Sequence, residues 1–476
     1  MKVLARLLFL LCCFLLPAKA ALRPEHVAVV YNEASDFSRE CALDYAKLRG
    51  IPSRNLLPIS VDVKKKDITQ AEFDLDVRAP LRALSANRQL QFSGDSRFGM
   101  YPIYAMAVMP DLPWRIKPIP TKKGEKAPPW PRTVASSVDS ELALVGSVSY
   151  PREGSLRNDY YNMDEGLPDK GFRALSVCRI DSPKHDVTRR LMTTPVKVEK
   201  WGGLRGATMV DWGGPHAAGD ANFRALAQHA ADSGQQLYVH PIKPTLEPCY
   251  PMPQPCAMYF GWYHEHACGP FRMAQVKPSF TFEPGAVAVH LHSFSAAVLQ
   301  AKRAWVGPLL MKGAAVTAGN TWEPYLHGSL NFKIFHNRLL KGYCVAEAAL
   351  MATPMLSWQG VVIGDPLYRP YPRLKKSPMT AETAANVLLL KKKYDEALNA
   401  FAALHKAATD EAQRLRAALA CAQALILLKR GAEAKGLLEE IEQHESKSLY
   451  IGAVRAMKKH YFPPPPPPKK GDSAGK

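Results

Sequence analysis

Short apolar runs alternate with segments of helical spacing along most of this 476-residue chain. Residues 26–32 (HVAVVYN), 56–63 and 104–109 (YAMAVM) have the length and apolar content of buried strands, and residues 38–50 have helical spacing that stops at a glycine. A second series of strands is predicted at residues 173–180, 207–212, 236–240, 257–263, 286–291 and 314–319. Strands that alternate with helices favour parallel pairing, so we predict an α/β fold of mostly parallel, doubly wound sheets.

The composition changes at residue 381, beyond which Ala, Leu, Lys and Glu dominate and Gly and Pro are rare until Pro463. Amphipathic helices are predicted at residues 381–391, 394–406, 411–429 and 433–444. KKKYDEALNAF and LKRGAEAKGLL occupy equivalent positions about 37 residues apart, close to the 34-residue period of tetratricopeptide repeats. We therefore predict an all-α, tetratricopeptide-like tail, too short to be stable alone, which docks on the main domain or on a partner.

Residues 1–20 have the pattern of a secretory signal peptide. Lys2 and Arg6 precede an apolar run at 7–16, and Ala18-Lys19-Ala20 follows it. A run of about ten apolar residues is too short to span a bilayer, and no later run approaches about 18, so no transmembrane anchor is predicted. We expect an exported protein that acts in the periplasm or outside the cell.

These changes in character divide the chain into five parts. They are a signal peptide (1–20), an N-terminal α/β subdomain (21–172), a C-terminal α/β subdomain (173–375), a helical-repeat region (380–460) and a disordered proline-rich end (463–476). The formal net charge of +19 would suit a nucleic-acid partner. The only tight basic runs, at 64–66 and 391–393, are not interleaved with aromatic residues, so no specific nucleic-acid binding is predicted.

Cys249 and Cys256 flank a stiff, proline-rich hexapeptide and are the candidate pair for a disulfide in an oxidising compartment. Cys268 is a rival partner. The alternative for this cysteine cluster is zinc binding together with His264 and His266, although no Cys-x-x-Cys occurs. No cofactor is predicted.

Candidate catalytic residues follow several predicted strands, at the position where ligands bind in doubly wound sheets. They are Asp211, His264, His266, Ser293 and Ser295. A histidine at one strand end could take the proton of a serine hydroxyl at the next and make it a nucleophile. Neither serine lies in a G-x-S-x-G elbow, so a hydrogen-bonded structural corner is the alternative.

Candidate substrate-binding residues are His292, Asn320, Glu323, Asp139 and Glu141. The two carboxylates of VDSEL would share one face of a strand, or would lie at a helix start and favour its dipole. A metal-dependent hydrolase built on His264, His266 and His292 is a further hypothesis, although HEH lacks the spacing of H-E-x-x-H.

The chain resembles an uncharacterised family of exported bacterial proteins over about residues 26–372. The resemblance lies in VVYNEAS, RGIPSRNLLPI, SVDSELALV, CRIDSP, GAVAVHLHSFSA, WVGPLLMKGAAVTAGNTWEPY and VVIGDPLYRPY. It implies no activity.

A second resemblance is to gingipain-type, caspase-like cysteine peptidases. FGWYHEH stands where that pattern has its catalytic histidine, AVHLHSFSA stands where it has its catalytic cysteine, and MKGAAVTAGN and IGDPLYRP follow in order. Here Ser293 and Ser295 replace the cysteine, and the Gly-His-Gly triplet is absent. The resemblance implies a caspase-like sheet and a degenerate peptidase-like domain that binds extracytoplasmic protein or peptide, with residual hydrolysis through the serines. A non-enzymatic envelope scaffold that uses the helical tail is the alternative.

Overall fold

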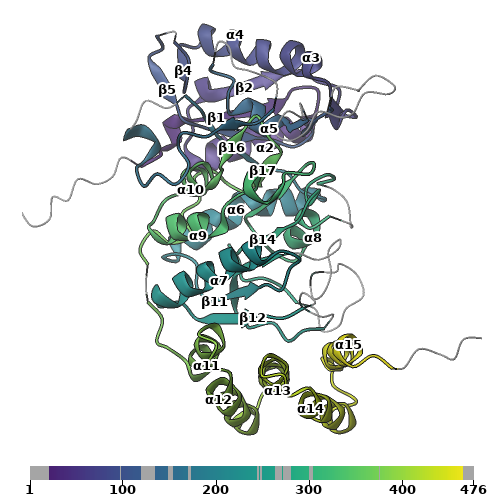
Figure 1. Cartoon of the computed structure of the whole chain (residues 1–476). Coiled ribbons are helices and arrows are strands. Elements are labelled where there is room, and N and C mark those ends of the chain that lie inside the picture. The colour runs from purple at the N-terminus through teal and green to yellow at the C-terminus, as the bar shows by residue number, and fades with distance from the viewer. Residues whose placement is uncertain are drawn as a thin grey trace, which may run out of the picture. The chain divides into compact units, whose positions relative to one another are not determined.

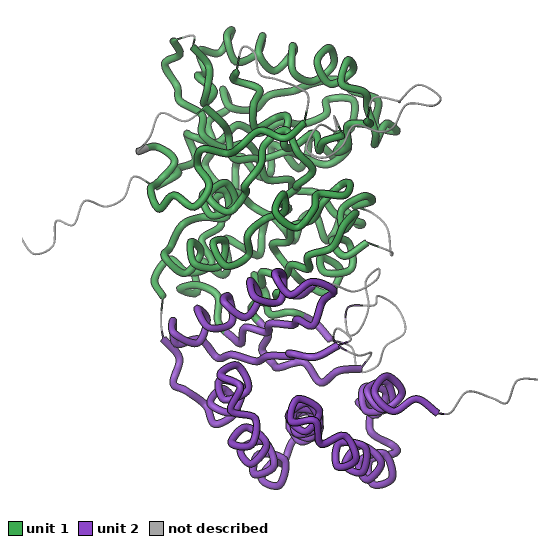
Figure 2. The backbone as a smooth tube through the Cα atoms, viewed as in Figure 1, with its two compact units in different colours: residues 1–205, 257–260, 282–375 green, residues 206–256, 261–281, 376–476 purple. Residues whose placement is uncertain are grey.

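The computed structural model describes residues 21–96, 98–118, 135–147, 154–169, 173–243, 246, 249–262, 271, 280–299, 304–374 and 376–464. The chain forms two compact units (Figure 2). Unit 1 comprises residues 1–205, 257–260 and 282–375, and unit 2 comprises residues 206–256, 261–281 and 376–476. Unit 1 therefore joins the segment predicted as the N-terminal subdomain to much of the segment predicted as the C-terminal one.

A six-stranded sheet forms the centre of unit 1, in the order β15-β17-β10-β6-β1-β2. Its strands are β1 (Val27–Asn32), β2 (Leu56–Ile59), β6 (Ala105–Val108), β10 (Ser176–Arg179), β15 (Thr317–Asn320) and β17 (Gly360–Ile363). All neighbouring pairs are parallel except β15 and β17, which are antiparallel. The chain winds one way from β1 to β2 and the other way to β6, so the switch point lies at the carboxyl ends of β1 and β6. The predicted α/β fold with parallel sheets is confirmed.

Helices and short strands complete unit 1 (Figure 1). The helices are α2 (Asp36–Arg49), α3 (Gln70–Glu72), α4 (Ala79–Asn87), α5 (Val138–Leu142), α6 (His185–Lys200), α8 (Val306–Met311), α9 (Phe332–Leu340) and α10 (Val345–Ala352). The further strands are β3 (Asp67–Ile68), β4 (Leu90–Phe92), β5 (Tyr101–Ile103), β7 (Arg115–Ile116), β8 (Ser136–Ser137), β9 (Leu156–Arg157), β14 (Val287–Leu291) and β16 (Met355–Leu356).

Local sequence explains where several of these helices begin and end. The Ser35 hydroxyl accepts the Ser38 N–H at the start of α2, and Gly50, at φ 70°, ends that helix. Residues Phe73–Arg78 form a π-helix ahead of α4, whose Pro80 has no N–H to give to a regular helix. Helices α9 and α10 are separated at Gly342, which has φ 87°.

In unit 2, β11 (Ala207–Asp211) and β12 (Leu237–His240) are parallel, and α7 (Ala217–Asp232) connects them. The chain passes between the two units within β13 (Cys256–Trp262). Five helices follow in succession (Figure 1): α11 (Ala381–Leu390), α12 (Tyr394–Ala407), α13 (Glu411–Leu427), α14 (Gly431–His444) and α15 (Ile451–Tyr461). The helical C-terminal region is confirmed, and α15 extends it beyond the four helices predicted.

The first of these helices, α11, packs against strand β12 of the same unit. The Asn386 side chain accepts the Val239 N–H at 2.9 Å. Glu382 accepts the Tyr238 hydroxyl at 3.1 Å and pairs with Arg416 at 2.6 Å. Helix α11 thus provides hydrogen-bond acceptors for one backbone N–H and one side-chain hydroxyl of β12. Over the described part of the chain, no helix combines the length and the apolar character needed to cross a bilayer.

Candidate functional site

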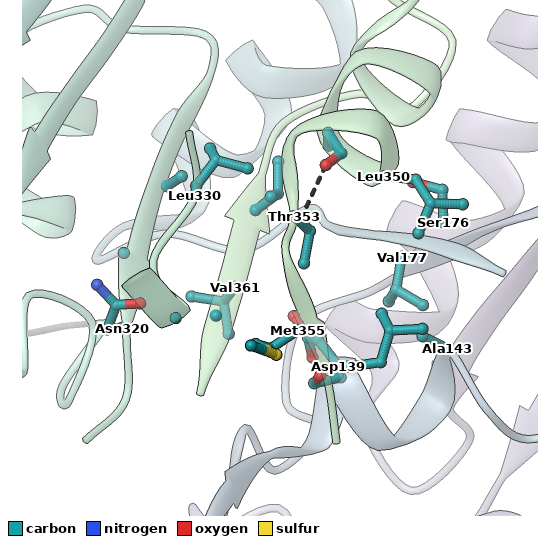
Figure 3. Close-up of a pocket in the computed structure, with 18 of the residues that line it drawn as sticks. Asp139, Ala143, Ser176, Val177, Asn320, Leu330, Leu350, Thr353, Met355 and Val361 are labelled. Atoms are coloured by element: carbon teal, nitrogen blue, oxygen red, sulfur yellow. Dashed lines mark hydrogen bonds between the residues drawn. The ribbon is translucent and has the colours of Figure 1, made fainter. Parts of the chain in front are cut away.

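A partly open pocket of about 60 Å³ lies in unit 1 where strands β10 and β17 diverge (Figure 3). β10 pairs with β6 through four residues, but with β17 only through Arg179 and Ile363. The amino-terminal parts of β10 and β17 are therefore not bridged to each other. Val177 and Gly360, which line this gap, are only partly buried although they belong to interior strands.

The pocket wall is mostly apolar and comes from both strands and from the helices that cover them. Val177, Val361, Leu330, Phe332, Leu350 and Met355 line it. The polar lining residues include Asp139, His290 and Asn320, of which Asp139 and Asn320 are predicted site residues. Figure 3 shows Asn320 beside Val361 and Asp139 beside Met355.

Asp139 and Glu141 lie in the five-residue helix α5, not on a strand, and both are bonded inside the protein. Asp139 forms an ion pair with Arg179, with its carboxylate oxygens 3.2 Å from Nε and one of them 2.5 Å from an Nη atom. Arg179 is fully buried and also donates to the carbonyl oxygen of Leu112 at 3.0 Å. Glu141 accepts the Ser357 hydroxyl at 2.6 Å. Asp139 therefore neutralises a buried cation at the edge of the pocket.

A parallel bridge joins Val287 of β14 to Val316, the residue immediately before β15. Asn320, at the end of β15, contacts the segment that follows β14 through Ser295 and His292. The predicted approach of His264 and His266 to Ser293 and Ser295 involves histidines outside the described residues. We call residues 292–298 and 320–326 the β14–β15 loop pair. Two backbone contacts join its halves: Ala296 N–H donates to the Asn320 oxygen at 2.9 Å, and Phe294 N–H donates to the Trp322 oxygen at 3.0 Å.

The predicted serine and histidine groups of the loop pair contact its backbone. The Ser295 hydroxyl, 1% exposed, accepts the Asn320 N–H at 3.0 Å. His292 Nδ1 lies 2.5 Å from the carbonyl oxygen of Ser293, a residue that is half-buried. The exposed Glu323 accepts the Tyr325 N–H at 3.2 Å. Ser295 is thus placed to hold the two loops together.

Two aromatic residues of the loop pair have an unusual conformation. Phe294 and Tyr325 have φ values of 57° and 56°, in the left-handed region that bulky residues rarely adopt. Both side chains are exposed, at 43% and 46%, and Val298 nearby is 43% exposed. These aromatic residues are not among the residues predicted from the sequence, because no local pattern signals a left-handed phenylalanine.

In unit 2, Asp211 is paired with a histidine that was not among the predicted site residues. Its Oδ1 lies 2.9 Å from Nδ1 of His240, the opposite residue of the parallel β11–β12 pair. Both side chains are buried, and Nε2 of His240 has no hydrogen-bond partner among the described residues. The one sequence feature that could have identified His240 as a candidate is its position at the end of a predicted strand. His264 and His266 lie outside the described residues.

The predicted disulfide between Cys249 and Cys256 is not present in the structure. Cys256 is the first residue of β13 and fully buried, and burial raises the pKa of its thiol. Cys249 lies in a turn with φ 60° and is partly exposed. Cys268 lies outside the described residues, and within the described ones no group of three or more metal-ligating side chains gathers.

A buried carboxyl group at the carboxyl end of β10 is another residue that the sequence analysis did not select as a site. Asp181 is 3% exposed, and burial raises its pKa from 3.8 to about 6. The charge of Asp111, which follows β6 near the switch point, acts in the same direction. The Asp181 carboxylate accepts the Ser182 N–H at 2.8 Å, which acts in the opposite direction.

Asp181→Asn should make the protein more stable at neutral pH. The folded-state pKa is raised, so folded protein binds more protons than unfolded protein between about pH 4 and 6, and stability falls as the pH rises through that window. Asparagine removes the buried charge and should add about 1–3 kcal/mol at pH 7.5 and little at pH 4. Urea unfolding of the variant and the wild type at four pH values measures the difference in their free energies of unfolding. An equal effect of the substitution at every pH would contradict it.

No family model, no curated protein and no solved structure matches this chain.

Proposed function

We propose that this protein binds a peptide or an extended protein segment, outside the cytoplasm, through the β14–β15 loop pair. One observation carries the proposal. Phe294 and Tyr325 are exposed aromatic residues with a left-handed backbone conformation, and they lie on two loops that are joined by backbone hydrogen bonds. A left-handed conformation costs a non-glycine residue on the order of 1–3 kcal/mol, and such strain is concentrated at functional sites. Glycine would avoid that cost, but it would lose the aromatic side chain.

The chemistry of the surface fits a peptide ligand. Large, rigid aromatic side chains are the usual anchors of protein interfaces, because they bury much area with few rotatable bonds. In the same loop pair, Val298 adds exposed apolar area and Glu323 adds an exposed carboxylate. Exposed aromatic and apolar area together with polar groups is typical of a recognition surface.

The loop pair is held in place by groups behind it, so that little ordering would be needed on binding. Trp114 Nε1 donates to the Ala297 oxygen at 3.3 Å, and Arg115 donates to the same oxygen at 3.2 Å. The Arg115 guanidinium also stacks on the Trp322 ring, 3.7 Å from its centroid. A preorganised surface loses less conformational entropy when it binds, which favours affinity.

Binding is better supported than hydrolysis at this site. A nucleophile must reach the substrate, and its base must lie within hydrogen-bond distance. Ser295 is buried, and its hydroxyl accepts a backbone N–H. The gingipain-like, caspase-like resemblance of this region also fits peptide binding, because Ser293 and Ser295 stand where that pattern has its catalytic cysteine. The signal-like sequence of residues 1–20 supports action outside the cytoplasm.

Substitution of Phe294 separates a binding role from a structural one. Phe294→Ala keeps the left-handed strain and removes the ring, whereas Phe294→Gly removes both. We expect both variants to lose binding at least tenfold, and the glycine variant to be about 1 kcal/mol more stable than the alanine variant. Binding is measured with peptides selected on the purified wild-type protein from a displayed random heptapeptide library, and stability by urea unfolding.

Gln89→Gly is the matched control, because Gln89 is exposed and has φ 55° in the same unit. It should relieve the same kind of strain and leave peptide affinity unchanged. Tyr325→Ala should weaken binding as Phe294→Ala does. If no peptide is selected, or if all Phe294 variants bind like wild type, the loop pair is not the binding surface.

A further inference from the structure

We infer that the pocket between β10 and β17 receives one aliphatic side chain of the bound peptide, an inference that rests on the proposed function. The pocket adjoins the β14–β15 loop pair directly. Asn320 belongs to the loop pair and lines the pocket, and Leu291, which precedes the other loop, lines it too. The Asn320 amide donates to the His292 oxygen at 3.4 Å, so one side chain borders both features. A peptide held on Phe294 and Tyr325 has a side-chain pocket next to it.

The size of the pocket selects a small group. Its volume is about 60 Å³. An apolar cavity of about 150 Å³ binds a benzene molecule, and this pocket has less than half of that volume. The pocket therefore favours a short branched chain such as that of Val or Leu over the ring of Phe, Tyr or Trp.

The polar groups at the pocket do not favour a charged guest. The Asp139 carboxylate is already paired with Arg179, so it is not available to neutralise the ammonium group of a lysine. A carboxylate on the bound peptide side chain would be repelled by the negative charge of Asp139. The Ser176 and Thr353 hydroxyls donate to the carbonyl oxygens of Ala346 and Ala349, at 2.6 and 2.8 Å. With these donors engaged, the pocket offers mainly apolar contacts.

The wall facing β14 is rigid. His290 stacks on Trp305, with ring centroids 3.4 Å apart and planes 8° apart, and its Nδ1 lies 3.0 Å from the Tyr259 hydroxyl oxygen. Both contacts fix the imidazole at the pocket border. A fixed border discriminates by shape, because a larger guest cannot displace it without breaking both contacts.

The test uses N-acetyl amides of single amino acids as probes on the purified full chain, with binding measured by titration calorimetry or by ligand-observed NMR. N-acetyl-valine amide and N-acetyl-leucine amide should bind at least tenfold more tightly than the alanine, phenylalanine, lysine and aspartate amides. Val177→Phe, which fills the gap between the strands, should weaken the valine probe at least tenfold. Leu84→Phe is the control, because Leu84 packs partly buried on the same core but does not line the pocket.

The outcomes separate this inference from the proposed function. If selected peptides bind through Phe294 but show no aliphatic preference, and Val177→Phe leaves their affinity unchanged, the pocket assignment is wrong and the proposed function stands. If the valine probe binds selectively and Val177→Phe abolishes it, while no selected peptide depends on Phe294 or Tyr325, the aliphatic specificity stands and the proposed function fails. Equal affinity of wild type for all six probes, as expected if ordered water fills the pocket, overturns the inference even if Val177→Phe does not fold.

Discussion

Asp139→Ala should lower the free energy of unfolding by about 3–5 kcal/mol, because it leaves a buried guanidinium without its counter-ion. Arg179 is fully buried, and besides its pairing with the Asp139 carboxylate it donates to the carbonyl oxygens of Leu112 and Pro113 at 3.0 and 2.9 Å. Carbonyl dipoles do not replace a full negative charge. A carboxylate held for a ligand would behave differently, since its removal would weaken binding and leave stability nearly unchanged.

Urea unfolding of the variant and wild type at pH 7.5 measures the effect. The double variant Asp139→Leu with Arg179→Met is the control, because removing both charges together is much less destabilising than leaving one of them unpaired. It should regain most of the stability that Asp139→Ala loses. A loss below about 1 kcal/mol for Asp139→Ala would show that the pair is not what neutralises Arg179.

Arg416→Ala should destabilise unit 2 by about 3–5 kcal/mol. The side chains of Arg416 and Glu382 are only 11% and 8% exposed, with their charged atoms 2.6 Å apart. Arg416 also donates to the carbonyl oxygen of Pro251 at 3.0 Å. Its removal leaves a nearly buried carboxylate with the Tyr238 hydroxyl as a remaining partner, and it frees the helical region from the loop before β13.

Arg414→Ala is the matched control on the same helix. Arg414 pairs with Glu445 at 2.8 Å, but the two side chains are 30% and 26% exposed, so the loss should be no more than about 1 kcal/mol. Amide hydrogen exchange in β12 distinguishes the two variants, because the Val239 N–H donates to the Asn386 side chain. Unchanged exchange in β12 after Arg416→Ala would mean that the helical region is not held to β12 through this network.

The periodicity of the sequence was sufficient to predict the longer buried strands and the amphipathic helices of the C-terminal region. Strand β1 differs from its predicted bounds by one residue, and α2 and β6 by one or two, because a buried strand needs a short apolar run and a helix needs spaced apolar positions. Helix α15 was missed, although Ile451, Val454 and Met457 are buried on one face of it. These apolar residues are few and follow a polar segment, so the helical spacing of apolar positions was weak there.

The antiparallel pairing of β15 with β17 could not be predicted, because strand order depends on contacts distant in sequence. The same limit applies to the candidate site. The sequence singled out His292, Ser293 and Asn320 as candidates, since polar residues follow predicted strands there. It did not reveal that Arg179 would take up the Asp139 carboxylate, forty positions away in the chain, which required the fold.

The conformation of Phe294 and the pairing of Asp211 with His240 also required the structure. The backbone of Phe294 is set by the Trp322 oxygen on a separate strand-end loop. His240 meets Asp211 because two parallel strands place their last residues side by side. In both cases local sequence provided the residue types, and tertiary contacts determined their arrangement.

Hydrogen–deuterium exchange of the full chain, with and without a selected peptide, tests the peptide-binding proposal most directly. Binding at the β14–β15 loop pair should slow exchange in segments that cover residues 292–298 and 320–326, and should leave the carboxyl ends of β1 and β6 unchanged. Protection confined to the helices at 381–461, or to the switch point of the sheet near Asp111 and Asp181, would contradict the proposed function.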